Sequence, residues 1–269
     1  MQRFIQRYRY SVILLRELVR TDFKIRYQDS ALGYIWSLLR PLLLFLILYF
    51  VFTKFLKVGK DVPHYAVYLL LGIVLWNFFA ELTTGSVNAI VGKSDLIRKI
   101  NFPKYNIVIA ASLSALINLL LNFIVIAIFM VFSKVAPTLD AVILIPLVIE
   151  LYILSLGVAF LLSTLFVKFR DVSYVWDVVI QGAFYATPIL YPLSRIPYHR
   201  LQELLIVNPI AQIIQDSRYV LVTKDTATIS QVFGGDKWIW GIPIALTIII
   251  LIIGSWYFRK RSRFFAEEA

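Results

Sequence analysis

The sequence contains no cysteine and only two histidines among its 269 residues. The absence of cysteine excludes a disulfide framework and thiol chemistry, and two histidines without a cysteine argue against a structural zinc site. Charged residues are scarce at 16% of the chain, whereas hydrophobic residues make up 60% and the mean hydropathy is +0.79. This is not the composition of a soluble domain, so the sequence predicts a polytopic membrane protein.

Motifs for ATP hydrolysis and for catalysis are absent as well. Gly92-Lys93-Ser94 resembles the end of a nucleotide-binding phosphate loop, but Val87 stands where that loop requires its first glycine. A phosphate loop also follows a strand, and here a membrane helix is expected instead. No acidic pair, catalytic triad or metal-ligand spacing occurs. We therefore expect that the chain is not an enzyme and binds no ATP, cofactor or metal itself.

The formal net charge of +11 predicts an orientation in the membrane rather than a nucleic-acid partner. The basic residues are spread between the hydrophobic runs, whereas a nucleic-acid-binding protein gathers them on one surface. With the N-terminus inside, 18 of the 27 lysines and arginines fall on the cytoplasmic side and 9 fall outside. Because lysine and arginine are enriched in cytoplasmic loops, this asymmetry predicts that both termini are cytoplasmic.

The hydrophobic runs predict an all-α fold with six transmembrane helices. The first run has about 22 residues, which at 1.5 Å per residue is enough to cross about 30 Å of hydrocarbon. The third and sixth runs carry no charge at all. The predicted spans cover residues 34–56, 65–91, 107–132, 139–167, 172–193 and 238–258.

Residues 1–30 are predicted to form a cytoplasmic amphipathic helix ahead of the transmembrane domain of residues 31–269. Apolar residues recur there every three or four positions, with charged residues mostly on the other side, as in a helix that lies in the headgroup plane. Ser30 is a candidate cap and Gly33 a candidate bend into the first span. The apolar stripe consists of Ile5, Tyr8, Val12, Leu15, Val19 and Phe23.

The cytoplasmic loop of residues 92–103 is predicted to contain a short helix between two spans. Leu96, Ile97 and Ile100 give this helix an apolar side. The alternative is that the loop is a solvated connector.

The outer segment of residues 194–222 is too apolar for a loop in water and too interrupted to span the bilayer. We expect a pair of short re-entrant helices, with Asn208 as the N-cap and Pro209 as the first residue of the second helix. Pro188 and Pro192 break the preceding span just before this segment. The pair is interpreted as a lid over a channel, and the alternative is a hairpin that packs on the outer surface.

Polar side chains within the predicted spans are candidates for a substrate path. Glu81, Glu150 and Asp177 are costly in hydrocarbon and are expected to face a bundle interior or water. Glu81, the deepest, is interpreted as a polar point on the path, or alternatively as a protonated or paired group at a helix interface. Asn118 and Asn122 lie one turn apart and are expected to form interhelical hydrogen bonds.

Aromatic residues make up 15% of the chain and fall into two groups. The first lies at span ends and is typical of the membrane interface; it contains Trp36, Trp238, Trp240, Trp256 and Tyr257. The second lies inside spans, where aromatic faces suit the C–H faces of sugar rings, with core packing as the alternative. It contains Trp76, Phe78, Phe79, Tyr174, Trp176, Tyr185 and Tyr191.

Several segments resemble, in family order, the type-2 ABC exporter permeases that carry cell-surface polysaccharides. They begin with Leu-Val-Arg-Thr-Asp-Phe-Lys-Ile-Arg-Tyr at 18–27 and Leu-Gly-Tyr-Ile-Trp-Ser-Leu-Leu-Arg-Pro at 32–41. The chain looks most like the rhamnose-polysaccharide export permeases of Gram-positive bacteria, with teichoic acid and O-antigen permeases as relatives. The further matches are Leu-Ile-Arg-Lys-Ile-Asn-Phe-Pro at 96–103, Phe-Arg-Asp-Val at 169–172, Ala-Thr-Pro-Ile-Leu-Tyr-Pro at 186–192 and Asn-Pro-Ile-Ala-Gln-Ile-Ile at 208–214.

The resemblance implies a homodimer in the bacterial cytoplasmic membrane, bound to two ATP-binding cassette ATPase subunits that hold ATP and Mg²⁺. It implies export of a lipid-linked polysaccharide for cell wall biogenesis, with glycan entry near Leu32-Gly33-Tyr34. The implied ATPase-docking residues lie in the N-terminal helix and the 92–103 loop: Arg20, Lys24, Asp95, Leu96, Arg98 and Phe102. The candidate substrate path comprises Leu32, Gly33, Tyr34, Trp76, Phe79, Glu81, Trp176, Tyr185 and Tyr191.

Two alternatives remain at this stage. A permease for a drug or small lipid has the same topology, and the aromatic residues favour a glycan only weakly. An integral-membrane glycosyltransferase is the alternative from another class, but the chain has neither an acidic pair nor a sizeable domain outside the membrane. The glycan and its lipid carrier are not fixed by the sequence.

Overall fold

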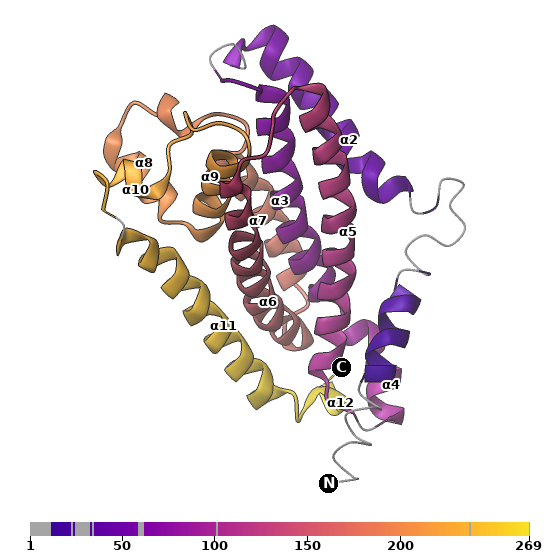
Figure 1. Ribbon diagram of the computed structural model, residues 1–269. Helices are drawn as coiled ribbons and strands as arrows, with labels where there is room; N and C mark the ends of the chain where they lie inside the picture. The colour runs from indigo at the N-terminus through magenta and orange to yellow at the C-terminus, as the bar shows by residue number, and fades with distance from the viewer. Residues whose placement is uncertain are drawn as a thin grey trace.

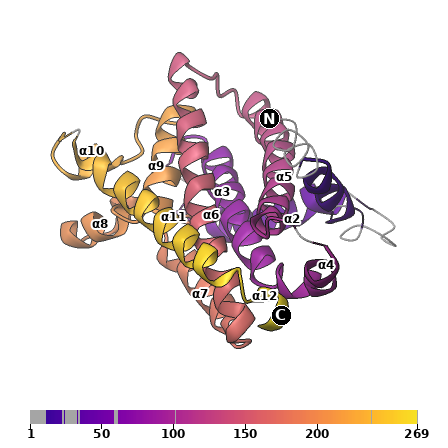
Figure 2. The same cartoon turned by 90° about the horizontal axis from the view of Figure 1, so that it is seen from below.

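The computed structural model describes residues 12–22, 24, 33, 35–58, 62–100, 102–236 and 238–268. Over these residues the protein is helical throughout and contains no strand, which confirms the predicted all-α class (Figure 1). The helices form an elongated bundle with short helices gathered at its two ends (Figure 1), and Figure 2 shows the same bundle from below.

Within the described part of the chain, five helical segments are long and apolar enough to cross a membrane. A sixth, α7 (Val172–Ala186), has only 15 residues, so the prediction of six crossings stays a prediction. The five are α2 (Ile35–Phe50) with its π-helical extension η1 (Val51–Phe55), α3 (Tyr65–Val87), α5 (Tyr105–Phe132), α6 (Leu144–Lys168) preceded by η4 (Leu139–Ile143), and α11 (Gly241–Arg261) preceded by η6 (Trp238–Trp240).

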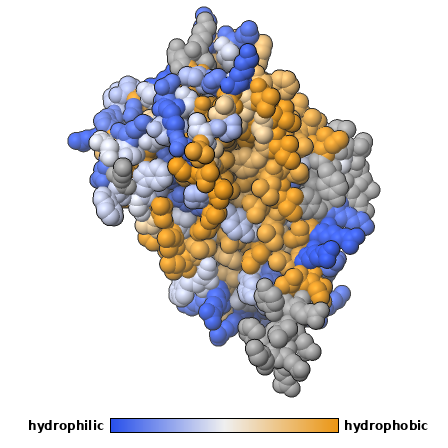
Figure 3. All heavy atoms as spheres, in the orientation of Figure 1, coloured by the Kyte–Doolittle hydropathy of each residue, from blue (hydrophilic) through white to orange (hydrophobic). Residues whose placement is uncertain are grey.

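Helix α3 forms the centre of the bundle. It packs against α2, α5, α6, α7 and α9, and 78% of its most apolar stretch is buried. The corresponding figures are only 11% for α2 and 17% for α11. A helix that is apolar on all sides is stable either inside a protein or in lipid, so α2 and α11 present faces suited to lipid. Apolar side chains accordingly dominate the middle of the face shown in Figure 3.

Helix α7 is shorter than the sequence predicts. It ends at Ala186 rather than at residue 193, because Pro188 disfavours helical geometry at the residue before it. Thr187 is extended, with φ −80° and ψ 137°. The chain then continues through η5 (Leu193–Arg195), α8 (His199–Ile206), α9 (Pro209–Leu221) and α10 (Ile229–Val232).

Two short helices, α8 and α9, lie where the re-entrant pair was predicted, and their re-entry into the bilayer stays a prediction. The Asn208 side chain accepts a hydrogen bond from the Ile210 N–H at 3.1 Å, and Pro209 is the first helical residue, as predicted. Most of the apolar side chains of this segment are buried against the protein, whereas Leu201 and Leu204 on α8 are exposed. We call the end of the bundle that carries α8, α9 and α10 the α9 end.

The opposite end, which we call the α4 end, carries helical residues 12–22, η3 (Val91–Lys93), α4 (Ser94–Lys99) and α12 (Phe265–Glu268) (Figure 1). The predicted short helix in the 92–103 loop is therefore confirmed. Gly33 has a φ of +48°, the left-handed geometry that glycine tolerates, which confirms a bend before α2. The N-terminal part of the predicted amphipathic stripe and the candidate cap Ser30 lie outside the described residues.

Candidate functional site

At the α4 end, helix α4 is held on two sides and keeps a charged face exposed. The Lys93 ammonium donates to both carboxylate oxygens of Asp22, at 2.8 and 3.0 Å, which ties the N-terminal helix to the start of α4. On the other side α12 contacts α4, and Phe265 is almost fully buried against Phe258, with ring centroids 5.3 Å apart. The apolar side of α4 points inward through Ile97.

The residues that the resemblance assigns to ATPase docking differ in how far they are exposed. Arg20, Lys24, Asp95 and Arg98 are exposed, Leu96 is half-buried and Phe102 is buried. Four of the six therefore keep a charged side chain exposed, while Phe102 packs inside the bundle.

The structure brings three of the aromatic path candidates, Trp76, Phe79 and Trp176, together where α3 meets α7. The ring centroid of Trp76 lies 5.8 Å from Phe79 and 6.0 Å from Phe184, and Phe79 lies 6.3 Å from Trp176. Trp76 and Phe79 are almost fully buried. The Trp176 indole donates to the Thr83 hydroxyl at 3.2 Å. This inner part of the aromatic group is core packing between two helices, which was the alternative interpretation.

The outer face of α7 carries a polar and aromatic stripe. Tyr174, Asp177, Gln181 and Tyr185 are all exposed, and at 100° per residue they fall within about 80° of the helix circumference. The Tyr191 hydroxyl donates to the Tyr185 carbonyl at 3.3 Å, which places Tyr191 beside the end of this stripe. A carboxylate in a span is unfavourable against lipid, so this face suits water, a polar ligand or another protein surface. The sequence analysis named three of these residues and missed Gln181, although the helical spacing would have found it.

Glu81 lies apart from the aromatic group, on the side of α3 that faces α5. The Asn118 amide donates to the Glu81 carboxylate at 2.6 Å, and the Asn122 amide donates to the Asn118 carbonyl at 2.8 Å and to the Ser37 carbonyl of α2 at 3.4 Å. The expected interhelical hydrogen bonds of the two asparagines are confirmed. Glu81 is a paired, half-buried group at a helix interface. Of the residues expected near glycan entry, Gly33 is half-buried, and Leu32 and Tyr34 lie outside the described residues.

At the α9 end, a fully buried arginine binds the non-helical stretch that follows α7, which we call the break after α7. The Arg218 guanidinium of α9 donates to the carbonyls of Tyr68 at 3.0 Å, Pro188 at 2.8 Å and Ile189 at 2.6 Å. It also stacks on the Tyr68 ring, 3.7 Å from the centroid. Buried backbone carbonyls must find hydrogen bonds within the protein, and Arg218 supplies two of them to the break.

Neighbouring side chains complete this arrangement. The Gln215 amide also donates to the Pro188 carbonyl, at 2.9 Å, and the Tyr65 hydroxyl donates to the Leu190 carbonyl at 2.8 Å. A Cβ at Gly72 of α3 would lie within 2.3 Å of the guanidinium, so only glycine leaves room for Arg218 there. We call Arg218, Gln215, Tyr65, Tyr68 and Gly72 the α9 latch.

The α9 latch was not predicted from the sequence. A lone arginine in an apolar segment is a signal that buried acceptors are needed. The acceptors themselves could not be read from the sequence, because two are backbone carbonyls about 30 residues earlier, freed where α7 ends, and the third is the Tyr68 carbonyl of α3.

Asp216, beside the α9 latch, is almost fully buried. Burial raises the pKa of its carboxyl group to about 7, against the opposing effect of a hydrogen bond from the Gln212 amide. Between about pH 4 and pH 7, Asp216 therefore keeps its proton, whereas an exposed aspartate is charged.

Residues 13–222 match the model of the family described as ABC-2 type transporter. The chain is 31% identical over 259 residues to an O-antigen export system permease protein RfbA of Klebsiella pneumoniae, covering 96% of this chain and 95% of that relative. A protein of the same description from Myxococcus xanthus is 25% identical, with 97% and 96% covered. The polysialic acid transport protein KpsM of Escherichia coli is 23% identical, with 80% and 81% covered.

Proposed function

The chain belongs to the ABC-2 type transporter family, and from this premise we propose that it is the membrane permease subunit of an ATP-driven exporter that moves a lipid-linked polysaccharide across the cytoplasmic membrane. The observation that carries the proposal is similarity along 96% of the chain to a permease of O-antigen export. Two further relatives bear names of polysaccharide transport. The finer assignment to a rhamnan or teichoic acid rests on the sequence resemblance alone.

The proposed energy source is an ATP-binding cassette ATPase that docks at the α4 end and holds ATP and Mg²⁺. Asp95 and Arg98 are exposed on α4, while Ile97 anchors its other side. A short helix fixed between α12 and the N-terminal helix can pass a partner's movement to the spans as a rigid body. This assignment makes the α4 end cytoplasmic, together with both termini.

The proposed substrate path runs along the exposed stripe of α7 in a homodimer. Asp177 and Gln181 are unfavourable against lipid, and a second copy that faces them across a water-filled path removes that conflict. Tyr174 and Tyr185 offer aromatic faces for sugar rings. Trp76, Phe79 and Trp176 support this wall from behind, and glycan entry is proposed near Leu32, Gly33 and Tyr34.

A depletion experiment separates the proposal from its alternatives. Cells that lose this chain are expected to keep making the lipid-linked glycan but to hold it on the cytoplasmic side, and wild-type chain restores it to the surface. If total glycan falls instead, the chain is a glycosyltransferase. If surface glycan is unchanged while a drug or small lipid accumulates, the chain is a permease for that compound. Purification of the tagged chain in nanodiscs is expected to recover an ATPase subunit at equal stoichiometry.

A further inference from the structure

Helix α11 lies at the edge of the bundle and turns one face away from it (Figure 1). The opposite face packs on α6, where Gly254 has no room for a Cβ against the Gly157 carbonyl and the Phe258 ring lies 5.0 Å from Phe160. Six exposed residues in the second half of α11 fall within about 120° of the helix circumference at 100° per residue. We call them the α11 outer face: Ile249, Ile252, Ile253, Trp256, Arg259 and Lys260.

The chemistry of the α11 outer face changes along the helix axis. Three isoleucines come first, Trp256 follows, and Arg259 and Lys260 occupy the last turn. A membrane leaflet presents hydrocarbon, interface and charged headgroups in the same order, and tryptophan is enriched at that interface. Because Trp256 and Lys260 are separated by a rise of about 6 Å, one lipid molecule can contact both.

The cations of this face are available to an anion. Within the described part of the chain, Arg259 and Lys260 take part in no ion pair. The Lys260 ammonium lies 5.0 Å from the centroid of the Trp256 ring, a contact that positions it beside the ring and leaves N–H donors for an anionic oxygen. Residues 256–264 contain four cations and no acid. The nearby Glu267 lies on α12, which packs against α4.

We propose that the α11 outer face binds an anionic phospholipid in the leaflet at the α4 end. Its phosphate contacts Arg259 and Lys260, and its acyl chains lie along the isoleucines. Basic side chains at the end of a membrane helix attract anionic headgroups. The inference does not depend on which substrate the chain exports.

Other occupants fit this face less well. A second copy, related by a two-fold axis along the membrane normal, would bring the same cations together at one depth, and like charges in contact are unfavourable. A water-soluble partner reaches the cations but leaves the isoleucines uncovered. Because α11 continues through a short turn into α12, and α12 packs on α4, a lipid held here borders the helix proposed to dock the ATPase.

Native mass spectrometry of the full-length chain in a neutral detergent tests this site. Phosphatidylglycerol and phosphatidylcholine with the same acyl chains are titrated, so that only the headgroup differs. We expect saturable binding of phosphatidylglycerol, with higher affinity than phosphatidylcholine. Arg259→Gln with Lys260→Gln should weaken it about 25-fold, or about fivefold for each cation, whereas Arg259→Lys with Lys260→Arg should retain it. Each single glutamine variant should show the fivefold step if the double variant is not monodisperse.

Lys168→Gln with Arg170→Gln is the matched control, because it removes two exposed cations from the end of α6 and the turn after it, outside the α11 outer face. It should bind phosphatidylglycerol like the wild type. The inference is overturned if phosphatidylcholine binds as tightly, if the control weakens binding as much as the α11 variant, or if the α11 variants bind like the wild type. Loss of ATPase recovery with unchanged lipid binding would assign the face to the protein partner instead and would also overturn it.

Discussion

The two ends of the bundle use the same residue types in opposite ways. At the α9 end, Arg218 is fully buried and donates its hydrogen bonds to backbone carbonyls of the same chain. At the α4 end, Asp95 and Arg98 are exposed on a helix whose other side is buried. A charge that is buried must be satisfied internally, whereas an exposed charge remains available to another molecule.

This difference gives the polar residues of the α9 end a structural role, and it is consistent with the docking role proposed for those of the α4 end. The break after α7 leaves carbonyls that only the protein interior can satisfy, and the α9 latch satisfies them. Helix α4 is not interrupted in this way, because it is a continuous short helix between η3 and α5. Variants at the two ends should therefore fail differently, in stability at one and in export at the other.

The largest effect is expected from Arg218→Met. The substitution keeps an unbranched side chain but leaves three buried carbonyls without the guanidinium, and hydrogen bonds to charged groups contribute about 1.5–3 kcal/mol each. We expect the free energy of unfolding to fall by at least about 3 kcal/mol in denaturant titrations of the purified protein. Arg200→Met, an exposed arginine on α8, is the control and should change stability little. Equal effects of the two substitutions would contradict the structural role of the α9 latch.

Reversal of the charges on α4 should separate export from stability. In the double variant Asp95→Arg with Arg98→Asp, both side chains are exposed, so the free energy of unfolding should stay within about 0.5 kcal/mol of wild type. Surface glycan and ATPase recovery should both drop to background, because the docking charges face a partner of unchanged charge. A matched reversal at the other end, Arg200→Glu with Asp236→Lys, should leave export intact. Normal export by the α4 variant would make the 92–103 loop a mere connector.

A smaller effect concerns the pH dependence of stability through Asp216. The pKa of this carboxyl group is about 7 in the folded protein and 3.8 ordinarily, so unfolding releases a proton between these values. Stability should therefore fall as pH rises from about 4 to about 7. Asp216→Asn should flatten this slope in unfolding titrations across that window, while Asp225→Asn, an exposed aspartate, should keep it. A slope that persists in Asp216→Asn would place its origin elsewhere.

The smallest effect is expected from the ion pair that joins the N-terminal helix to α4. Lys93 and Asp22 are 22% and 25% exposed, and such a partly exposed pair contributes less than about 1 kcal/mol. Asp22→Asn should barely move the unfolding midpoint but should speed amide exchange in the helix of residues 12–22. Glu17→Gln, on the same helix, is the control. Unchanged exchange in Asp22→Asn would show that apolar packing through Leu18 and its neighbours, and not the ion pair, holds this helix.

Local features of the chain were predictable because they depend on neighbouring residues. The helical class, the start of α9 at Asn208 and Pro209, and the short helix α4 follow from periodicity, capping and proline chemistry. The long apolar runs identify membrane-spanning helices because lipid imposes one length and one composition on them. The hydropathy of the α8–α9 segment also indicated that this segment is too apolar for a loop in water.

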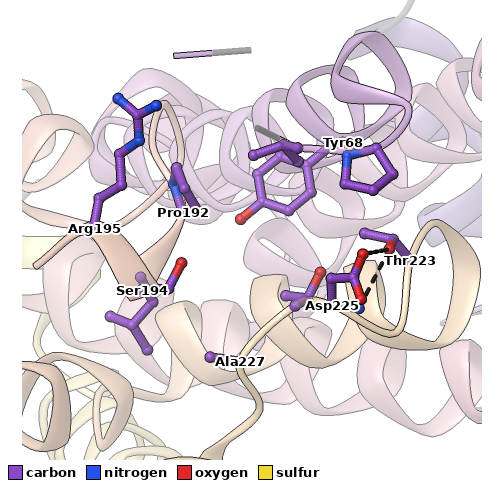
Figure 4. A pocket seen from close by; sticks show the side chains of 11 residues that line it. Tyr68, Pro192, Ser194, Arg195, Thr223, Asp225 and Ala227 are labelled. Atoms are coloured by element: carbon purple, nitrogen blue, oxygen red, sulfur yellow. Dashed lines mark hydrogen bonds between the residues drawn. The ribbon is translucent and has the colours of Figure 1, made fainter. Parts of the chain in front are cut away.

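The partners of the polar residues were decided only by the tertiary structure. Sequence reasoning left Glu81 open between a path and an interface, and the fold pairs it with Asn118. It extended α7 to residue 193, whereas the helix ends at Ala186 and the freed carbonyls meet Arg218 across the bundle. A cavity beside Tyr68, lined by the start of α3, the turn after α7 and the loop that follows α9, likewise exists only because segments more than 100 residues apart converge (Figure 4). Hydrogen bonds between distant segments leave no periodic trace in the sequence, since backbone carbonyls are the same at every residue and only the fold selects which of them need a donor.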